Sequence, residues 1–555
     1  MTEADVPTSP GRSPKEFLRD ASLILLAGLL LGAPRLWAKS LWSPDEARYA
    51  EVAREMSVTG NYLIPRVYGE PETSYPPLYY WLIALSSLPP GRVSALSATL
   101  PSLLAALGVG LLTYGIGRTL WDRRSAFLSA LVLMPMAGFV GPAILCRGDM
   151  TMVLLEVAAL LFFTRWYRDR DSGAFPLAFY VALAGAVLVK GPQAVLIVGG
   201  IVLVFLGVRG ELGLVRRLRL LPGLAVFLVL TLPWFVWAWR TTRQDFLLGE
   251  SLSGFAGTLV PGGHSRRSWW TYLGVIAVRA FPWILFLPSA LALIWRDERA
   301  GSIPRRPDGA LAFLGSWIAV VLVFYTLAAA KRYYYVTAVY PAVALAVGRF
   351  WARGAGPGTV PASFLRLPLV ALALLALGSE LYLDLGPSRI GSFDLTSPRW
   401  GYHCLPVAAL IAAAAGLALP VGGHKLPMVA TILGALAAAA HLGSMALYEI
   451  PQNRRDEEDG RRFVETLEGA MRPGDPVYLF QEDVPSVALH LGRECRILRT
   501  PGELRARTAS GERVIVGVKE WRLPDAQAIL GPARIVFREP IPGGGAVLIF
   551  LRPEP

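Results

Sequence analysis

Residues 41–56 read LWSPDEARYAEVAREM and directly follow the first apolar run of the chain. They place two adjacent carboxylates, Asp45 and Glu46, at the start of a short predicted helix. Ser43, Pro44 and Glu46 fit a capping box, in which both acids would simply favour the helix dipole. That role accounts for Glu46 and leaves Asp45 to point toward a cavity. Acidic side chains beside a bilayer usually serve chemistry or ion handling, so both interpretations of Asp45 stay open here.

The chain as a whole is too apolar for a soluble protein. Of its 555 residues 54% are hydrophobic, and the mean hydropathy is +0.46. Apolar runs of about 20 residues, long enough to cross a bilayer, recur along the chain. We therefore predict a mainly α, polytopic membrane protein with about 13 spans. The runs lie near residues 20–38, 95–116, 126–145, 150–165, 174–190, 193–208, 220–239, 271–294, 309–328, 333–350, 364–383, 403–421 and 427–449.

The net charge of +13 reflects membrane topology rather than binding to nucleic acid. Arginines gather in alternate loops between the apolar runs, and the positive-inside rule makes those loops cytoplasmic. The tail 1–19 is polar and carries Arg12, Lys15 and Arg19 before the first apolar run, without a convincing cleavage site, which indicates an uncleaved first helix with its N-terminus inside. An extra span at Tyr75–Leu88 would invert every later loop, so we assign that segment to an interfacial or re-entrant helix. The basic loops hold Arg118, Arg123, Arg124, Arg165, Arg168, Arg170, Arg209, Arg216, Arg217, Arg219, Arg296, Arg299, Arg305, Arg306, Arg349 and Arg353.

This topology divides the chain into a cytoplasmic tail (1–19), a membrane domain (20–451) with an outer loop at 39–94, and an extracytoplasmic C-terminal region (452–555). The C-terminal region opens with the charged run Arg454–Arg462. It then alternates helix-like stretches with the β-prone runs VYLF, RVIVGV and GAVLIF, as in a small soluble α/β domain. The three cysteines show neither metal spacing nor a disulfide framework.

Several candidate functional residues share the predicted outer face with Asp45. Asp149 follows Arg147 in a short turn, either as a local ion pair or as a second acid that converges with Asp45. Lys190 and Lys331, two of only six lysines, lie at outer helix ends. They are either snorkelling side chains or cations for a lipid phosphate. His264 is either structural or a ligand of a metal or phosphate.

The order of motifs in this half of the chain resembles the protein O-mannosyltransferase superfamily of integral-membrane glycosyltransferases, in particular the bacterial branch containing the aminoarabinose transferase of lipid A. The match covers roughly residues 20–350. It consists of SPDEARYAEVAREM, PPLYYW, RGDM, KGP, an outer loop ending in WW, and KRYYYVTAVYPAVAL.

The resemblance implies eleven to thirteen spans, an active site on the outer face, and a polyprenyl-phosphate-linked sugar as donor. It assigns Asp45 and Asp149 as the catalytic acids. It implies that Lys190, Lys331, Tyr335 and the loop with His264, Arg266 and Arg267 occupy donor-phosphate and cavity positions. Our further candidates for substrate binding are Glu46, Arg48, Tyr75, Arg147 and Tyr334.

One position departs from that branch. Its members carry Glu-Lys immediately before the Pro-Pro of PPLYYW, where this chain has Ser74 and Tyr75. In the branch the Glu is associated with a metal and the Lys with the lipid phosphate. The departure argues against a divalent metal, so no cofactor is firmly implied. It also argues against aminoarabinose as the sugar. Lys190, Arg266 or another cation would then bind the lipid phosphate.

We therefore predict a glycosyltransferase of the bacterial cytoplasmic membrane, acting on the outer face by an inverting single displacement. The acceptor would be lipid A, another glycolipid or glycan, or a protein. Membrane lipids are expected partners and nucleic acid is not. The main alternative is a polytopic transporter of envelope precursors, which would show internal symmetry and charges near mid-span. A non-catalytic scaffold for envelope assembly is a third interpretation.

Overall fold

The computed structural model describes residues 14–37, 39–243, 270–300, 309–328, 331–353, 362–385, 389–390, 393–394, 433–434, 450–471, 476–493, 495–509, 515–531, 533–541 and 547–553. Six of the described helices are long and apolar enough to cross a membrane, or up to eight if each bent helix pair is one span. The chain is thus a mainly helical, multi-pass membrane protein. The predicted spans at 403–421 and 427–449 fall almost entirely outside the described residues, so the number of about thirteen stays a prediction.

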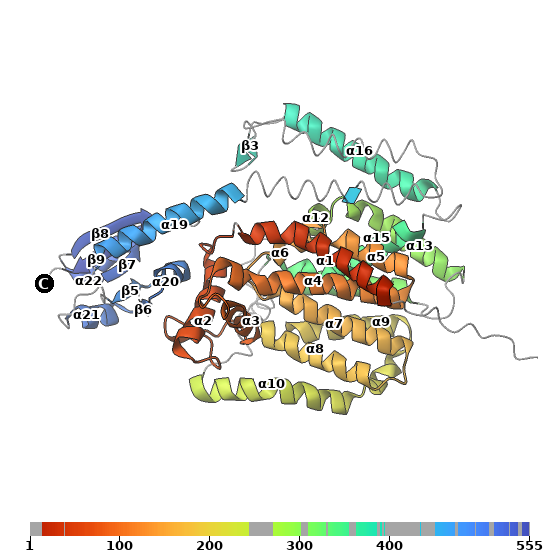
Figure 1. The fold of residues 1–555 in the computed structure, drawn as a ribbon, viewed down its shortest axis with the longest axis horizontal. Helices are drawn as coiled ribbons and strands as arrows, with labels where there is room; N and C mark the ends of the chain where they lie inside the picture. Colours follow the sequence, from red (N-terminus) through yellow and green to blue (C-terminus); the bar gives the residue numbers. More distant parts are fainter. Residues whose placement is uncertain are drawn as a thin grey trace, which may run out of the picture.

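The membrane domain is a bundle of helices that lie side by side along the long axis of the molecule (Figure 1). The predicted runs match its helices closely. The helices are α1 (Pro14–Trp37), α4 (Ala95–Leu120), α7 (Asp149–Arg168), α8 (Ala174–Lys190), α9 (Gln193–Val208), α10 (Leu220–Thr242), α14 (Ala310–Leu327), α15 (Tyr340–Arg353, preceded by the 3-10 turn η3, Tyr335–Val339) and α16 (Ala362–Leu385). The turn η1 (Leu212–Arg217) joins α9 to α10.

Two predicted spans are broken in the structure. The run at 126–145 forms α5 (Arg123–Leu133) and α6 (Ala137–Ala143), and the bend between these two helices is 67°. The run at 271–294 forms α12 (Thr271–Arg279) and, after η2 (Trp283–Phe286), α13 (Leu287–Arg299), with a bend of 104°. A proline, Pro135 or Pro282, lies at each break, where it removes a backbone donor and cannot continue the preceding helix. Each of these two apolar runs is therefore a bent helix pair in the structure rather than one continuous helix.

The outer loop folds into two helices and a hairpin. α2 (Pro44–Thr59) is followed by strands β1 (Arg66–Val67) and β2 (Glu70–Pro71) and by α3 (Leu78–Ser87). α3 has 10 residues. At 1.5 Å per residue it is too short for a hydrocarbon layer of about 30 Å, which agrees with the decision not to count it as a span. The Tyr79 hydroxyl joins it to α4 through Ser102 Oγ at 2.8 Å.

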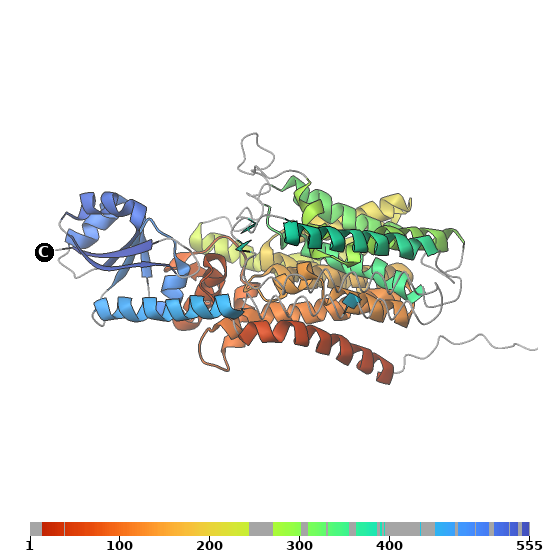
Figure 2. The same ribbon diagram turned by 90° about the horizontal axis from the view of Figure 1, so that it is seen from above.

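The C-terminal region is a five-stranded sheet with helices, beyond the end of the bundle at which α1 ends (Figures 1 and 2). The strand order is β6-β5-β7-β9-β8. β5 pairs in parallel with β6 and β7, and β9 is antiparallel to its neighbours. The elements are α19 (Ile450–Ala470), β5 (Val477–Phe480), α20 (Pro485–Leu491), β6 (Cys495–Leu498), α21 (Pro501–Ala509), β7 (Ile515–Lys519), η5 (Glu520–Arg522), α22 (Leu523–Leu530), β8 (Ala533–Pro540) and β9 (Val547–Pro553).

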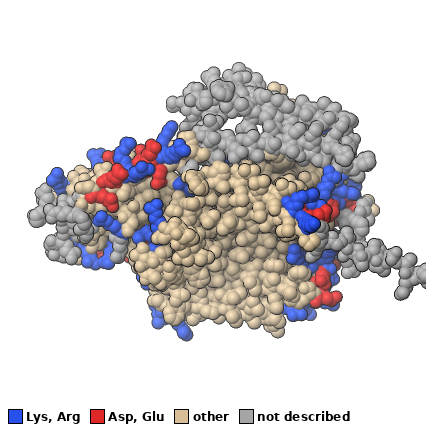
Figure 3. Space-filling model, in the orientation of Figure 1, with Lys and Arg blue, Asp and Glu red and all other residues tan. Residues whose placement is uncertain are grey.

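The predicted small α/β region is therefore present: the run VYLF is β5, and the described parts of the other two β-prone runs lie in β7 and β9. The predicted charged run at 454–462 lies within α19. Figure 3 shows charged side chains gathered toward the two ends of the long axis, with a wide uncharged band between them. Such a band is what a membrane-spanning surface requires, because charged side chains are expensive within the hydrocarbon.

Candidate active site

The start of α2 lies against the turn that leads into α7. Ser43 occupies the N-cap and Pro44 the first helical position, as predicted, but the Ser43 side chain makes no capping hydrogen bond. Glu46 is buried, and its Oε2 atom accepts from Lys39 Nζ at 2.7 Å while Oε1 accepts from the Cys146 N–H at 2.7 Å. The predicted capping box is thus wrong, because a lysine and a distant backbone amide take both oxygens of Glu46. Glu46 instead ties α2 to the turn before α7.

Asp45, next to Glu46, is the more accessible of the two acids. Its side chain is 52% exposed, and its Oδ2 atom accepts from Arg147 Nη1 at 2.9 Å. Among the residues that the structure describes, none donates a hydrogen bond to Asp45 Oδ1. Asp45 therefore has a fixed orientation and an oxygen left for a further donor.

Arg147 connects the two acids that the sequence singled out. Besides Asp45 it contacts Asp149, through Nε and Oδ2 at 3.3 Å. Asp149 is 3% exposed and its Oδ1 atom accepts from Lys190 Nζ, which is also buried. The sequence prediction that Asp45 and Asp149 converge is confirmed. Four charges, carried by Asp45, Arg147, Asp149 and Lys190, form one chain of ion pairs, which we call the outer cluster.

Local sequence explains this convergence. Asp149 is the first residue of α7 and Lys190 the last of α8, so each charge complements its helix dipole. Gly148 lies where α7 meets α8, and a Cβ there would stand 2.9 Å from Val189 Cγ1. Gly191 ends α8 with a φ of 90°, a conformation that glycine adopts without strain. Two glycines thus allow the two helix ends to approach closely.

Tyrosines surround the cations of the outer cluster. The guanidinium carbon of Arg147 is 4.4 Å from the ring centroid of Tyr334, and Lys190 Nζ is 5.0 Å from that of Tyr335 and 5.5 Å from that of Tyr75. The ring of Tyr49, on α2, stacks on Tyr75 with centroids 5.7 Å apart. Tyr75, Tyr334 and Tyr335, predicted to bind substrate, therefore lie at the cluster, where cation–π contacts hold the charges in place.

Two predicted residues lie elsewhere. Lys331 Nζ donates to the carbonyls of Thr326 and Ala328, at 2.7 and 3.2 Å, and so caps the C-terminal end of α14. Arg48 donates to Glu72 at 2.7 Å and also binds Asp483 of the C-terminal domain. His264, Arg266 and Arg267 lie outside the described residues.

Other residues near the outer cluster were not predicted. Lys39 lies two residues before the motif at 41–56, and Tyr49 lies within it. The signal for Lys39 was its position close to the acids Asp45 and Glu46 in sequence. Arg279, at the end of α12, stands 3.8 Å from the ring centroid of Tyr333. Glu156 lies seven residues after Asp149 and therefore on the same face of α7. It is 2% exposed, and neither of its carboxylate oxygens has a hydrogen-bond partner within the described part of the chain.

The residues near Ser74 do not fit a metal ion. Glu72 is the nearest substitute for the missing Glu, yet Arg48 binds its Oε2 atom and the Ser74 N–H binds Oε1 at 2.9 Å. Among the described residues, no group of three or more His, Cys, Asp or Glu side chains is placed to hold a metal. We therefore derive no step of the chemistry through a metal.

The outer loop also packs against the C-terminal domain. Trp42, three residues before Asp45, is 1% exposed. Its ring stacks on that of His490 with centroids 4.0 Å apart and meets Phe463 edge-on at 5.9 Å. Gly460 on α19 leaves room for the indole, because a Cβ there would stand 2.1 Å from it. The segment that carries Asp45 is thus clamped by α19 and α20.

Fold and site together define a class: a multi-pass membrane protein with a tyrosine-lined ion-pair cluster at one end of its bundle and a small α/β domain packed beside it. Residues 74–237 match the family described as dolichyl-phosphate-mannose-protein mannosyltransferase. In fold, the chain is similar to ArnT from Cupriavidus metallidurans bound to undecaprenyl phosphate, with a TM-score of 0.72, 20% identity and 97% of each chain covered.

Curated relatives agree with this fold. The chain is 31% identical to an undecaprenyl phosphate-alpha-4-amino-4-deoxy-L-arabinose arabinosyl transferase from Pseudomonas aeruginosa, over 66% of this chain and 65% of that protein. It is 29% identical to the enzyme of that name from Pseudomonas paraeruginosa, over 80% of each. Against two relatives from Pseudomonas fluorescens it spans 63% and 52% of their length. These matches confirm the resemblance to a family of integral-membrane glycosyltransferases, the one that is protein O-mannosyltransferase-like and aminoarabinose transferase-like.

Proposed function

We propose that this protein is a glycosyltransferase that moves a sugar from a polyprenyl-phosphate-linked donor to an envelope acceptor, by an inverting single displacement. The observation that carries the proposal is the outer cluster, in which the half-exposed Asp45 is paired with Arg147, and Asp149 links Arg147 to a second cation, Lys190. The ArnT neighbour bound to undecaprenyl phosphate and the arabinosyl transferase relatives support a lipid-linked donor and, among sugars, a pentose. They also favour a glycolipid such as lipid A as acceptor.

In this mechanism the acceptor attacks the anomeric carbon and the lipid phosphate leaves with the bonding electrons. Asp45 is the base that takes the proton of an acceptor hydroxyl, through Oδ1, which accepts no hydrogen bond from the described residues. If the acceptor atom belongs to a phosphate, deprotonation is unnecessary and Asp45 only orients the groups. Arg147 and Lys190 neutralise the charge that develops on the leaving phosphate. Asp149 positions these two cations, since it contacts both.

We place the outer cluster and the C-terminal domain on the extracytoplasmic side of the bacterial cytoplasmic membrane. The supporting observation is that basic residues predicted to be cytoplasmic, Arg123 and Arg349, lie at the other end of the bundle beside the start of α1. The same topology keeps the proposed domains at 1–19, 20–451 and 452–555, with about thirteen spans.

The direct test is mass spectrometry of envelope glycolipids from cells with the protein, without it, and with the Asp45→Asn variant. We expect one added sugar residue, a pentose or a hexose, to be present only with the unaltered protein. An identical glycan profile in all three strains would refute the proposal, whichever sugar is involved.

A transporter of envelope precursors remains the second candidate because of Glu156. This carboxyl is buried two turns inside α7 without a hydrogen-bond partner among the described residues, as expected for a transport site. The experiment that separates the two compares Asp45→Asn with Glu156→Gln. Transport predicts that Glu156→Gln alone abolishes movement of the lipid-linked precursor, whereas transfer predicts that Asp45→Asn abolishes the glycan change.

A further inference from the structure

Arg279, the last residue of α12, is a cation that the outer cluster does not use. Its guanidinium carbon lies 3.8 Å from the ring centroid of Tyr333, and a Cβ on Gly141 in α6 would stand 3.7 Å from its Nη1 atom. The side chain is half-buried. Among the residues that the structure describes, no acid, Glu156 included, forms an ion pair or a hydrogen bond with Arg279. Its positive charge therefore lacks a negative partner within the described part of the chain.

Two tyrosine rings connect Arg279 to the outer cluster. The rings of Tyr333 and Tyr334 meet edge-on with centroids 5.1 Å apart. Tyr334 in turn lies against Arg147, whose guanidinium carbon is 4.4 Å from its centroid. Tyr333 is also within electrostatic range of Asp149. Arg279 and Arg147 thus border the same pair of tyrosines, although α12 and the turn before α7 are far apart in the sequence.

The outer cluster by itself is electrically neutral. Its two acids, Asp45 and Asp149, balance its two cations, Arg147 and Lys190. A sugar that is linked to polyprenyl phosphate through a phosphodiester carries one negative charge, and such a charge needs a partner where water is scarce. Arg279 supplies one positive charge next to the cluster, which matches the charge of that donor.

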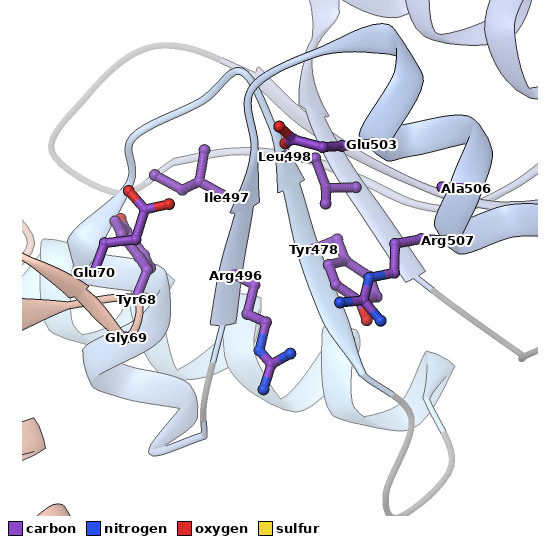
Figure 4. A pocket seen from close by; sticks show the side chains of 10 residues that line it. All are labelled: Tyr68, Gly69, Glu70, Tyr478, Arg496, Ile497, Leu498, Glu503, Ala506 and Arg507. Carbon is purple, nitrogen blue, oxygen red and sulfur yellow. The ribbon is translucent and has the colours of Figure 1, made fainter.

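The pocket between the outer loop and the C-terminal domain offers no such surplus. It has a volume of about 630 Å³ and is lined by the β1–β2 hairpin, by β5 and β6 and by α21 (Figure 4). Arg496 and Arg507 line it together with Glu70 and Glu503, so the charges of its lining balance. For an anion, Arg279 is therefore the better candidate.

An arginine that rests on an aromatic ring is suited to phosphate. The contact with the ring limits the orientations of the guanidinium group. Paired N–H groups of a guanidinium then match two oxygens of one phosphate. The positive-inside rule does not account for Arg279, because it lies at the end of the bundle that holds the outer cluster.

We propose that Arg279 binds the phosphate of the polyprenyl-phosphate-linked donor, beside the outer cluster. The assignment rests on the proposed function for the identity of the ligand, but binding needs neither an acceptor nor turnover. Polyprenyl phosphate, the product that remains once the sugar has left, keeps the same phosphate and should bind to Arg279 as well.

The test measures equilibrium binding of polyprenyl phosphate to the full-length protein in nanodiscs of phosphatidylcholine. The uncharged polyprenol of the same length is the second probe. Arg279→Gln should weaken binding of polyprenyl phosphate roughly tenfold, the size expected for lost charge-assisted hydrogen bonds, and leave binding of the polyprenol unchanged. Arg279→Lys should have an intermediate affinity, because an ammonium keeps the charge without the paired donors. Melting temperatures establish that both variants are folded.

Arg243 provides a matched control. It is the C-cap residue of α10, and its guanidinium carbon lies 5.1 Å from the ring centroid of Trp239. No acid among the described residues pairs with it. α10 reaches the outer loop, because Trp234 Nε1 donates to the Leu63 carbonyl at 2.8 Å. Arg243→Gln removes the same charge and the same kind of ring contact, yet it should bind polyprenyl phosphate like the unaltered protein.

Unchanged binding of polyprenyl phosphate by Arg279→Gln would overturn the proposal, and so would an equal loss in Arg243→Gln or an equal loss for the polyprenol. Phosphatidylglycerol in the nanodiscs tests for a general site for anionic lipids. If an equal amount of it displaced polyprenyl phosphate, the assignment to the donor would be wrong. A protein that binds through Arg279 but transfers no sugar would refute the proposed function and leave the binding site standing.

Discussion

Two clusters of ion pairs lie at opposite ends of the bundle, and they differ in what they leave unpaired. At the end where α1 begins, Arg123 donates to both oxygens of Asp20 at 2.7 Å. Asp122 accepts from the Ser125 N–H through Oδ1 and from Arg349 through Oδ2, although its side chain is 56% exposed. At the other end, Asp45 is 52% exposed and, among the described residues, accepts a hydrogen bond only through Oδ2.

The comparison shows that ion pairing in an apolar bundle does not by itself mark a reaction site. A buried charge needs a partner wherever it lies, because leaving it alone costs several kcal/mol. The inner cluster, made of Asp20, Asp122, Arg123, Asp297 and Arg349, pairs each of these charges and joins α1, α5, α13 and α15. The outer cluster pairs Asp149 with Lys190, yet among the described residues it leaves one oxygen of Asp45 without a donor.

The largest expected effect comes from the two exposed acids. Asp45→Asn should lower transfer by roughly 10²- to 10⁴-fold, the usual contribution of a general base, without changing the melting temperature. Asp122→Asn, which is equally exposed, should lower the melting temperature and leave turnover per folded molecule unchanged. Turnover and thermal unfolding of purified protein check both. Similar turnover in the two variants would remove the distinction between the clusters.

The second effect concerns one cation from each end of the bundle. Lys190→Ala leaves buried Asp149 without its closest partner and should destabilise the protein by about 3–5 kcal/mol. Arg123→Gln removes the partner of Asp20 at the other end and should also lower the melting temperature. Only Lys190→Ala should also weaken binding of polyprenyl phosphate, whereas Lys190→Arg should largely keep both properties. Donor titrations of folded protein at low temperature provide the measurement. An unchanged donor affinity in Lys190→Ala would mean that Lys190 serves stability alone, like Arg123.

A smaller effect should follow from disturbing the clamp on Trp42. Gly460→Ala places a methyl group where the indole lies, while alanine favours the helix by about 1 kcal/mol over glycine. We expect kcat to fall about tenfold with donor affinity unchanged, as a misplaced catalytic group loses rate steeply. Gly469→Ala, on the same helix with open space around it, is the control. If both variants had normal kcat, the clamp would have no bearing on Asp45.

The smallest effect is a pH dependence of the same clamp. Burial lowers the pKa of His490, although its contact with the Ser486 carbonyl opposes that shift. The folded protein therefore binds fewer protons here than the unfolded chain near pH 6, and stability should fall as pH falls through the ordinary histidine value of about 6.5. His490→Phe keeps a stacking ring and should remove this part of the pH dependence. Melting temperatures at pH 5.5 and 7.5 for both proteins decide it.

Periodicity, charge and composition were enough to predict the α/β domain, most helix bounds and the convergence of Asp45 with Asp149. They failed where a contact between distant segments decides the outcome. Glu46 fits a capping box locally, but Lys39 and the Cys146 amide outcompete that role. Nothing in the sequence shows that Lys331 caps α14, and its role at a lipid phosphate stays a prediction. Pro135 and Pro282 indicate the bends after α5 and α12. Both prolines lie within long apolar runs, which favoured one continuous span at each place.

The central claim, that Asp45 lines a lipid-phosphate site open to the outside, is tested most directly by Asp45→Cys in a chain whose three native cysteines are replaced by serine. Its thiol is labelled with a membrane-impermeant maleimide in intact spheroplasts. Our account predicts rapid labelling from outside that polyprenyl phosphate slows. Labelling that occurs only from the cytoplasmic side, or at a rate that the lipid leaves unchanged, would contradict it.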